Sequence, residues 1–139
     1  MTNEFSINIR VYIEDTDAGG IVYYPNYLKF MERSRTEFLR ELGFPKAAFI
    51  ADGFLVVVAS AQIDYRRSAK LDDEIQVTTF PEKVKRGSII MHQKVLRDGQ
   101  VLAEGRVRVA CINEQTAEPA PLPTELVLQL NKYLEEFSA

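Results

Sequence analysis

The hydrophobic pattern changes period along the 139-residue chain. Apolar and polar residues alternate from Phe5 to Ile13, which predicts a half-buried β-strand. From Asn26 to Leu42 apolar residues recur at steps of three and four, which predicts an amphipathic helix of about 17 residues, roughly 25 Å long. Charged residues, Arg33 and Arg35 among them, fill the polar face of this helix.

Turn-forming residues mark the end of the helix. Gly43 stands where a C-terminal cap is expected, and Pro45 prevents the helix from continuing. A short second helix is expected over Lys46 to Ala51, closed by Asp52-Gly53.

The chain from Phe54 to Ile112 has the pattern of β-strands. We expect strands over Phe54–Arg67, Ile75–Val84, Ser88–Arg97 and Val101–Cys111. Three consecutive valines, Val56 to Val58, predict burial on both faces of the first of these strands. Asp98-Gly99 is typical of a tight hairpin turn, and Lys85-Arg86-Gly87 predicts another turn. After three prolines, an apolar period from an N-cap at Thr124 to Phe137 predicts a C-terminal helix.

The order of elements predicts the fold class. One strand and a long helix precede four strands, which we expect to follow one another as a meander, and a helix ends the chain. Sequential hairpins favour an antiparallel sheet, and a long helix with one apolar face must bury that face against it. The prediction is an α+β fold with a curved antiparallel sheet around one central helix. The length and 46% apolar content favour a single domain over residues 1–139.

Composition narrows the class of function. The net charge of −3 and the absence of a strong basic block give no support for nucleic-acid binding. A single cysteine allows no disulfide within the chain, which suits the cytosol. Residues 1–9 lack the pattern of a signal peptide, and no apolar run approaches the roughly 20 residues of a membrane span. We therefore expect a soluble, cytoplasmic protein without a membrane span.

The residues with recognisable chemistry lie between the first strand and the long helix. The sequence E-D-T-D-A-G-G-I-V-Y-Y-P-N-Y contains three carboxylates, Glu14, Asp15 and Asp17. Two glycines follow, Gly19 and Gly20, which let a ligand approach the backbone closely. The helix start should carry unpaired N–H groups. A carboxylate facing such amides can act as a base or nucleophile while the amides stabilise an oxyanion.

Other interpretations of the same residues stay open. The three carboxylates also fit ordinary turn chemistry, in which Asp17 caps a turn. A calcium loop departs from its pattern at Gly19 and Asn26, whereas a Mg²⁺ site on Asp15 and Asp17 lacks an accompanying phosphate-binding motif.

Two isolated residues elsewhere have structural interpretations. His92 lies in the middle of a predicted strand without a G-x-S-x-G motif, so it is expected to be structural or on the surface. Cys111 lies on the apolar face of its strand and is expected in the core.

The segment V-Y-I-E-D-T-D-A-G-G-I-V-Y-Y-P-N-Y resembles the active-site signature of the 4-hydroxybenzoyl-CoA thioesterase family. The likeness continues over Leu28–Leu39, Asp64–Asp73, Arg86–Ser88 and the V-A-C-I near Val109, and so covers nearly the whole chain. It is closest to the bacterial acyl-CoA thioesterase branch associated with the Tol–Pal system. Tyr24 stands where that branch usually has histidine, and the Y-P-N-Y form instead resembles the 4-hydroxybenzoyl-CoA enzyme itself.

The resemblance implies a hotdog fold, a five-stranded antiparallel sheet wrapped around one long central helix. It also implies edge-to-edge homodimers or homotetramers, and partners in the Tol–Pal system or in lipid metabolism. Neither a metal nor a bound cofactor is expected.

The resemblance further implies an acyl-CoA thioesterase, which converts an acyl-CoA and water into a carboxylate and CoA. Asp17 is then the catalytic carboxylate, and the backbone N–H of Tyr24 polarises the thioester carbonyl. The expected acyl-binding residues, each with plain core packing as the alternative, are Tyr12, Val22, Tyr23, Tyr27 and Phe54. Gly19 and Gly20 would shape the loop. The candidates for the CoA phosphates, each as easily a solvated surface charge, are Arg66, Arg67, Lys70, Lys85 and Arg86.

Two rival functions remain. One is a non-enzymatic acyl-CoA-binding or scaffold protein of the same fold. The other is a hydratase or dehydratase, which ranks lower because that chemistry depends on a histidine beside the helix start and His92 lies far along the chain.

Overall fold

The computed structural model describes residues 4–46 and 53–138. Within these ranges, five antiparallel strands form one sheet in the order β1-β3-β4-β5-β2. The strands are β1 (Phe5–Arg10), β2 (Phe54–Tyr65), β3 (Glu74–Val84), β4 (Ser88–Arg97) and β5 (Gln100–Asn113). The helices are the 3₁₀ helix η1 (Ile13–Asp15), α1 (Asn26–Glu41) and α2 (Thr124–Ser138).

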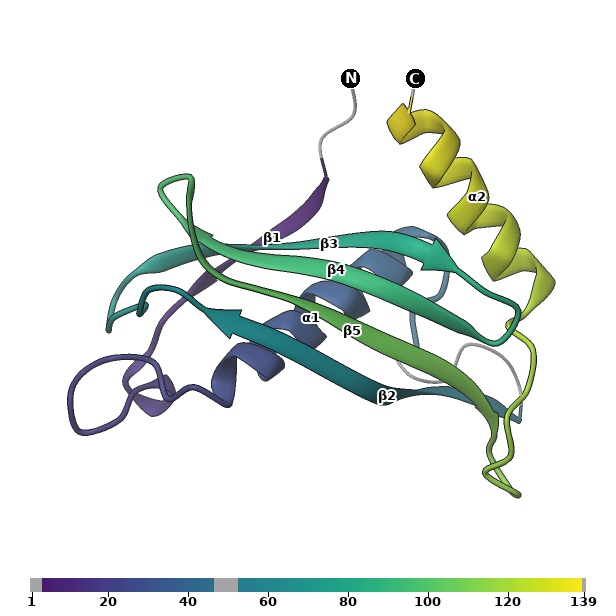
Figure 1. Ribbon diagram of the computed structural model, residues 1–139, viewed down its shortest axis with the longest axis horizontal. Coiled ribbons are helices and arrows are strands. Elements are labelled where there is room, and N and C mark those ends of the chain that lie inside the picture. The colour runs from purple at the N-terminus through teal and green to yellow at the C-terminus, as the bar shows by residue number, and fades with distance from the viewer. Residues whose placement is uncertain (1–3, 47–52, 139) are drawn as a thin grey trace.

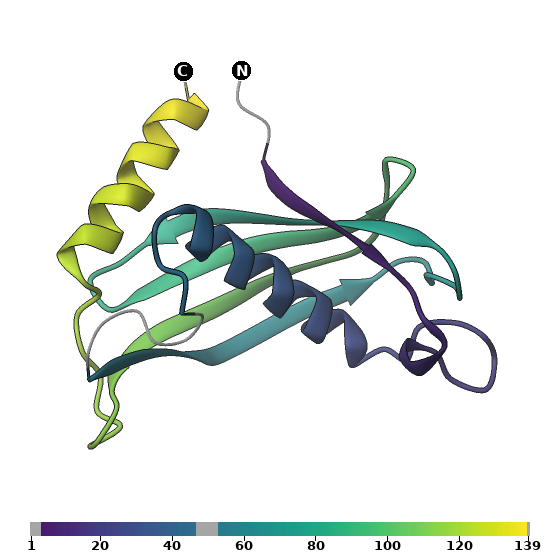
Figure 2. The ribbon, with the colours of Figure 1, turned by 180° about the vertical axis from the view of Figure 1, so that it is seen from behind.

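Helix α1 lies across one face of the sheet, and Figure 2 shows it in front of the strands (Figures 1 and 2). It contacts β1, β3 and β4. Its buried stripe includes Phe30, Met31 and Phe38, which share one hydrophobic core with Val77 and Met91 of the sheet. This arrangement confirms the predicted α+β class and the hotdog architecture.

The position of β2 corrects the predicted meander. Strand β2 pairs with β5, with Tyr65 opposite Ala103, and does not pair with β3. The connection between Tyr65 and β3 is a longer loop, which runs beside the loop before α1. There, Val22 N–H donates a hydrogen bond to the carbonyl of Ala69 at 2.9 Å. The chain thereby crosses the end of the sheet before β3 begins. The β3–β4 and β4–β5 hairpins are confirmed, with Asp98 and Gly99 at φ values of 50° and 79°.

The predicted burial of Val56 to Val58 on both faces of the strand is wrong, because β2 is an edge strand. Val58 is 52% exposed. On its paired side β2 approaches β5 closely at Gly105. A methyl group at Gly105 would lie 2.6 Å from the carbonyl oxygen of Gln62 and 2.9 Å from Cγ1 of Ile63. Only glycine fits between the two backbones here.

The helix boundaries follow the predicted pattern, but the end of the first strand does not. Helix α1 ends one residue early, with Leu42 as C-cap and Gly43 at φ 101°. Strand β1 ends at Arg10, and Ile13 is 76% exposed on η1 because the chain turns away from the sheet there. The predicted helix over Lys46–Ala51 falls, beyond Lys46, outside the described residues.

Helix α2 covers the end of α1 and the neighbouring part of β3. Leu126 and Leu130 are fully buried, and the ring of Tyr133 lies 5.1 Å from that of Phe38. The Tyr133 hydroxyl accepts a hydrogen bond from Phe5 N–H at 3.2 Å, which ties the last helix to the first strand. Cys111 is buried, as predicted. No helix in the described ranges is both long and apolar enough to cross a membrane.

Candidate active site

Asp15 fixes the loop that precedes α1. Its carboxylate accepts a hydrogen bond from Tyr12 N–H at 2.9 Å. Its backbone carbonyl accepts from Tyr23 N–H at 2.9 Å and from the side-chain amide of Asn26 at 3.0 Å. Asp15 is buried, so these bonds connect the end of β1 to the start of α1 in a protected environment. They give Asp15 a structural role.

Asp17 lies on the exposed part of the same loop. Its Oδ1 accepts a hydrogen bond from Gly19 N–H at 2.9 Å, while Oδ2 has no hydrogen-bond partner among the described residues. Gly20 adopts a φ of +78°, a conformation that glycine takes without strain, and its N–H donates to the Asp17 carbonyl. One carboxylate oxygen is thus anchored, and the other is available to a ligand.

A free backbone donor lies at the start of α1. A turn closed by Asn26 N–H and the Tyr23 carbonyl, at 2.8 Å, precedes the helix. Pro25 is the N-cap, with φ −65°, and has no N–H. In the described part of the chain, the N–H of Tyr24 has no acceptor. It lies at the positive end of the helix dipole, where an anionic oxygen is stabilised.

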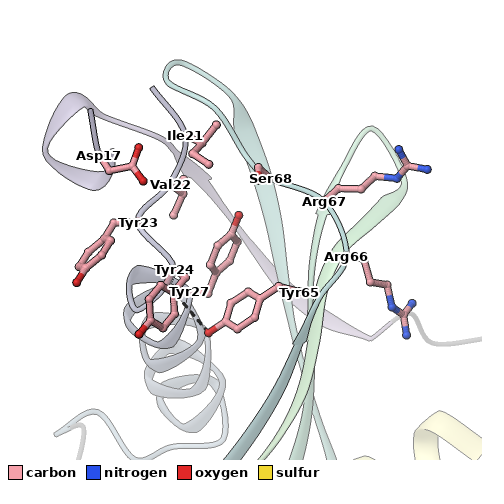
Figure 3. A pocket seen from close by; sticks show the side chains of 10 residues that line it. All are labelled: Asp17, Ile21, Val22, Tyr23, Tyr24, Tyr27, Tyr65, Arg66, Arg67 and Ser68. Atoms are coloured by element: carbon pink, nitrogen blue, oxygen red, sulfur yellow. Dashed lines mark hydrogen bonds between the residues drawn. The ribbon is translucent and has the colours of Figure 1, made fainter. Parts of the chain in front are cut away.

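These groups face a cavity of about 320 Å³. Figure 3 shows Asp17 and Tyr23 on one side, the rings of Tyr24, Tyr27 and Tyr65 in the middle, and Arg66 and Arg67 opposite. Its lining consists of Asp17, Ile21, Val22, Tyr23, Tyr24, Tyr27, Tyr65, Arg66, Arg67 and Ser68. The volume falls at the lower end of the roughly 300–1,000 Å³ of ligand pockets.

Tyr65 joins the tyrosine rings of the cavity. Its ring meets that of Tyr24 nearly edge-on, with centroids 6.0 Å apart and an interplanar angle of 85°. The ring of Tyr27 lies 5.4 Å away at 65°. The Tyr65 hydroxyl donates to the carbonyl of Tyr24 at 3.3 Å, as Figure 3 shows. Strand β2 therefore supports the turn that holds the free amide.

Two phenols of the cavity, those of Tyr27 and Tyr65, have raised pKa values. Burial raises the pKa of Tyr27, although the hydrogen bond that its oxygen accepts from Ala69 N–H, at 3.0 Å, opposes the shift. Burial also raises the pKa of Tyr65, with smaller contributions from Tyr24 and Tyr27. Asp17 is the one carboxylate in the lining, which otherwise consists of apolar and phenolic groups, Ser68 and the two arginines.

The structure brings together about half of the residues predicted for substrate binding. Val22, Tyr23, Tyr27, Arg66 and Arg67 line the cavity together with Asp17 and Tyr24. Gly19 and Gly20 shape the loop around Asp17 without lining the cavity.

Tyr12, Phe54 and Lys70 also lie outside the cavity lining. Tyr12 is 62% exposed ahead of η1, and Phe54 packs against the core at the opposite end of β2. The backbone of Lys70 bridges to Ile21 beside the loop, but its side chain does not line the cavity.

Lys85 and Arg86 lie at the far end of the sheet. They precede Ser88, which pairs with Ala110, whereas Tyr65 pairs with Ala103. Seven residues of a strand span roughly 23 Å. The structure therefore does not bring these two cations to the cavity of the same chain.

Sequence reasoning missed Tyr65, Ile21 and Ser68 as lining residues. Tyr65 belongs to the D-Y-R-R-S-A-K-L-D-D segment that carried the family resemblance, directly before the two arginines. An aromatic residue at the end of a strand, next to basic residues, was the available signal.

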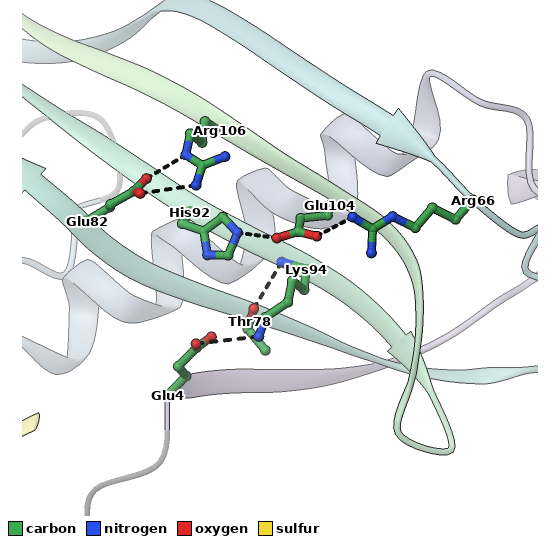
Figure 4. Close-up of polar contacts among 8 residues, drawn as sticks. All are labelled: Glu4, Arg66, Thr78, Glu82, His92, Lys94, Glu104 and Arg106. Carbon is green, nitrogen blue, oxygen red and sulfur yellow. Dashed lines mark hydrogen bonds and ion pairs between the residues drawn. The ribbon is translucent and has the colours of Figure 1, made fainter.

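His92 lies on the other face of the sheet from α1, in a group of ion pairs (Figure 4). Its Nε2 is 2.6 Å from Glu104, which also pairs with Arg66 at 2.7 Å. The hydrogen bond with His92 lowers the pKa of Glu104. His92 is therefore structural, as predicted, and is not beside the helix start. Across the described ranges, no three His, Cys, Asp or Glu side chains gather as a metal site.

The comparisons with known proteins agree with this geometry. The model of the thioesterase-like superfamily matches residues 11–130. The chain belongs to the thioesterase-like superfamily.

Relatives in this superfamily are similar over nearly their whole length. An acyl-CoA thioesterase of Haemophilus influenzae, YbgC, is 42% identical, over 91% of this chain and 93% of the relative. The acyl-CoA thioester hydrolase YbgC of Escherichia coli O6:H1 is 34% identical, over 94% and 98%. A solved gentisyl-coenzyme A thioesterase has a TM-score of 0.82 and 29% identity, over 90% and 98%. These findings confirm the family predicted from the sequence.

Proposed function

We propose that this chain is an acyl-CoA thioesterase and that its 139 residues act as one thioesterase domain. The observation that carries the proposal is the pairing of a carboxylate with a free amide at one cavity. Asp17 has one unengaged oxygen, and Tyr24 N–H has no acceptor in the described structure. The names of the YbgC relatives support the same reaction.

In the proposed reaction, the thioester carbonyl oxygen accepts a hydrogen bond from Tyr24 N–H. Asp17 then acts in one of two ways. As a general base it takes a proton from water, whose oxygen attacks the carbonyl carbon. As a nucleophile it forms an acyl anhydride that water hydrolyses. In both routes the C–S bond breaks, the thiolate of CoA takes up a proton, and the acyl group leaves as a carboxylate.

The cavity suggests how the substrate lies. The acyl group would contact the rings of Tyr23, Tyr27 and Tyr65, and the phosphates of CoA would lie towards Arg66 and Arg67. Figure 3 shows both guanidinium groups directed away from the tyrosines. Arg66 is paired with Glu104, so a phosphate there would compete with an existing ion pair.

The free edge of β2 supports a proposal about assembly. An unpaired strand edge is a template for pairing with another chain. We infer that two copies join along β2, as a homodimer or as half of a homotetramer. A cytoplasmic location and partners in the Tol–Pal system or in lipid metabolism belong to the same proposal.

Thiol release from a panel of aliphatic and aromatic acyl-CoAs, followed with a thiol reagent, tests the function. We expect turnover of part of this panel and a fall of about 10²–10⁴-fold in Asp17→Asn, as for loss of a positioned acid–base group. Glu14→Gln is the matched control, because Glu14 is an acid of the adjacent 3₁₀ helix that does not line the cavity. Its turnover should match that of the unmodified protein.

Two results would contradict the proposal. Undiminished turnover by correctly folded Asp17→Asn would remove Asp17 from the mechanism. Tight binding of acyl-CoA without thiol release from any member of the panel would favour a non-enzymatic acyl-CoA-binding protein.

A further inference from the structure

The outer face of the sheet, on the side away from α1, carries a row of charged side chains (Figure 4). A polar cavity of about 190 Å³ lies on this face. Its lining consists of Gln62, Asp64, Arg66, Glu104, Gly105 and Arg106. Arg66 also lines the cavity that contains Asp17 and the tyrosine rings. The side chain of Arg66 therefore connects the two cavities.

Glu104 holds the guanidinium of Arg66 on the outer face. Its Oε1 accepts a hydrogen bond from Arg66 Nη2 at 2.7 Å. Its Oε2 lies 2.6 Å from Nε2 of His92, so both carboxylate oxygens are engaged. Asp64, the other carboxylate of the outer cavity, forms no ion pair among residues 4–46 and 53–138. Glu104 is thus the carboxylate that sets the position of Arg66.

The carboxylate of Glu104 is anchored more firmly than the guanidinium that it holds. The side chains of His92 and Glu104 are only 17% and 25% exposed, whereas that of Arg66 is 54% exposed. The hydrogen bond with His92 lowers the pKa of Glu104 against the opposing effect of burial, and the charges of Arg66 and Lys94 add to the shift. Glu104 therefore stays ionised and in place, while Arg66 is the member of this group that a ligand can reach.

Arg67, the next residue along the chain, differs from Arg66 in this respect. Both arginines line the cavity of Asp17, and both backbone N–H groups donate to the carbonyl of Leu102, at 2.8 and 3.0 Å. The guanidinium of Arg67, however, forms no ion pair within the described structure. One cation beside the cavity is thus free, and the other is held by a carboxylate.

We propose that Glu104 is a positioning residue, which weakens the binding of the CoA phosphates because it retains Arg66 on the outer face. This inference rests on the proposed function, since it takes CoA as the ligand of the cavity. A phosphate that binds Arg66 must displace Glu104, so the broken ion pair offsets part of the gain. CoA is also a product of the proposed reaction, and weaker phosphate binding releases it sooner.

Calorimetric titration with CoA tests this role without any hydrolysis. Glu104→Gln keeps the shape of the side chain and removes its charge, so the affinity for CoA should rise about 2- to 5-fold, as for the release of an exposed ion pair. Glu82→Gln is the matched control. Glu82 pairs with Arg106 at 2.7 Å on the same face and lines neither cavity. This control removes the same charge, and its affinity for CoA should be unchanged.

A double-mutant cycle shows whether Glu104 acts through Arg66. In Arg66→Gln the further change Glu104→Gln should have no effect on the affinity for CoA, because no guanidinium remains to be released. Arg67→Gln, which removes the free cation, should weaken CoA binding more than Arg66→Gln does. An unchanged affinity in Glu104→Gln would overturn the proposal. A gain that persists in the Arg66→Gln background, or that Glu82→Gln reproduces, would overturn it as well.

Turnover separates this role from the proposed function. With an acyl-CoA, the change in Glu104→Gln should lie in KM, because the phosphates are remote from the reacting carbonyl and bind equally well in the ground and transition states. With the matching acyl-N-acetylcysteamine thioester, which has no phosphates, KM should not change. A chain that hydrolyses neither thioester but shows the expected CoA affinities would refute the thioesterase and keep the role of Glu104. Hydrolysis of both thioesters with no effect of Glu104→Gln on KM would do the reverse.

Discussion

Two cavities lie along α1, and they present hydrogen-bond donors in different ways. At the start of α1 the donor is the backbone N–H of Tyr24, freed by a turn of neighbouring residues. The second cavity lies between the middle of α1 and β2, and its donor is the side chain of the buried Arg35, oriented by Gln93, which is 58 positions away in the sequence. The first arrangement depends on local chain geometry and the second on long-range packing. They should therefore respond to different substitutions.

The largest effect is expected from removing the local donor. Tyr24→Pro deletes the amide N–H, and thioester turnover should fall about 10²–10³-fold, as for loss of an oxyanion donor. Tyr24→Phe keeps the amide and should retain turnover, measured on the same acyl-CoA. Circular dichroism would verify the fold of both variants. Equal losses in the two would mean that the phenol, and not the backbone donor, matters.

Breaking the long-range arrangement should affect stability instead. Gln93→Leu removes the acceptor of Arg35 and the donor to the Met31 carbonyl. Each buried polar group left unpaired costs about 1–3 kcal/mol, so the loss of both partners should lower the free energy of unfolding by about 2–6 kcal/mol. Urea unfolding would show a lower midpoint with an unchanged slope. Turnover below the unfolding transition should persist, and its loss would show that the two cavities are coupled.

A smaller effect is expected where a distant strand supports the local turn. Tyr65→Phe removes the hydroxyl that donates to the Tyr24 carbonyl and keeps the ring contacts. A net hydrogen bond contributes about 0.5–1.5 kcal/mol, so kcat/KM should fall about 2- to 10-fold, mainly through kcat. Tyr23→Phe is the control, because in the described structure the Tyr23 hydroxyl makes no hydrogen bond. An equal fall in both would point to general polarity of the cavity.

Structural features that depend on residues close together in the sequence were predicted well. The bounds of α1, the Asp98-Gly99 hairpin and the loop that presents Asp17 follow from hydrophobic period, turn residues and a contiguous signature. These features are encoded within a few residues of one another, so a pattern along the chain is sufficient to find them.

Features that depend on distant pairing were missed. Hydrophobic period indicates that Phe54–Tyr65 is a strand but not which strand it pairs with, so β2 was expected beside β3. Arg35 was placed on the polar face of α1, because its burial depends on Gln93 of β4. Tyr65 reaches the start of α1 only through the pairing of β2 with β5.

The absence of a side chain at Gly105 sets the position of β2, and with it one wall of each cavity along α1. Strand β2 supplies Tyr65 to one cavity and Val56 to Val58 to the other, and β5 holds it at a spacing that leaves no room for a methyl group at Gly105. An alanine there would act as a wedge between the two strands. Since both cavity walls belong to the same strand, one carbon atom would shift them together.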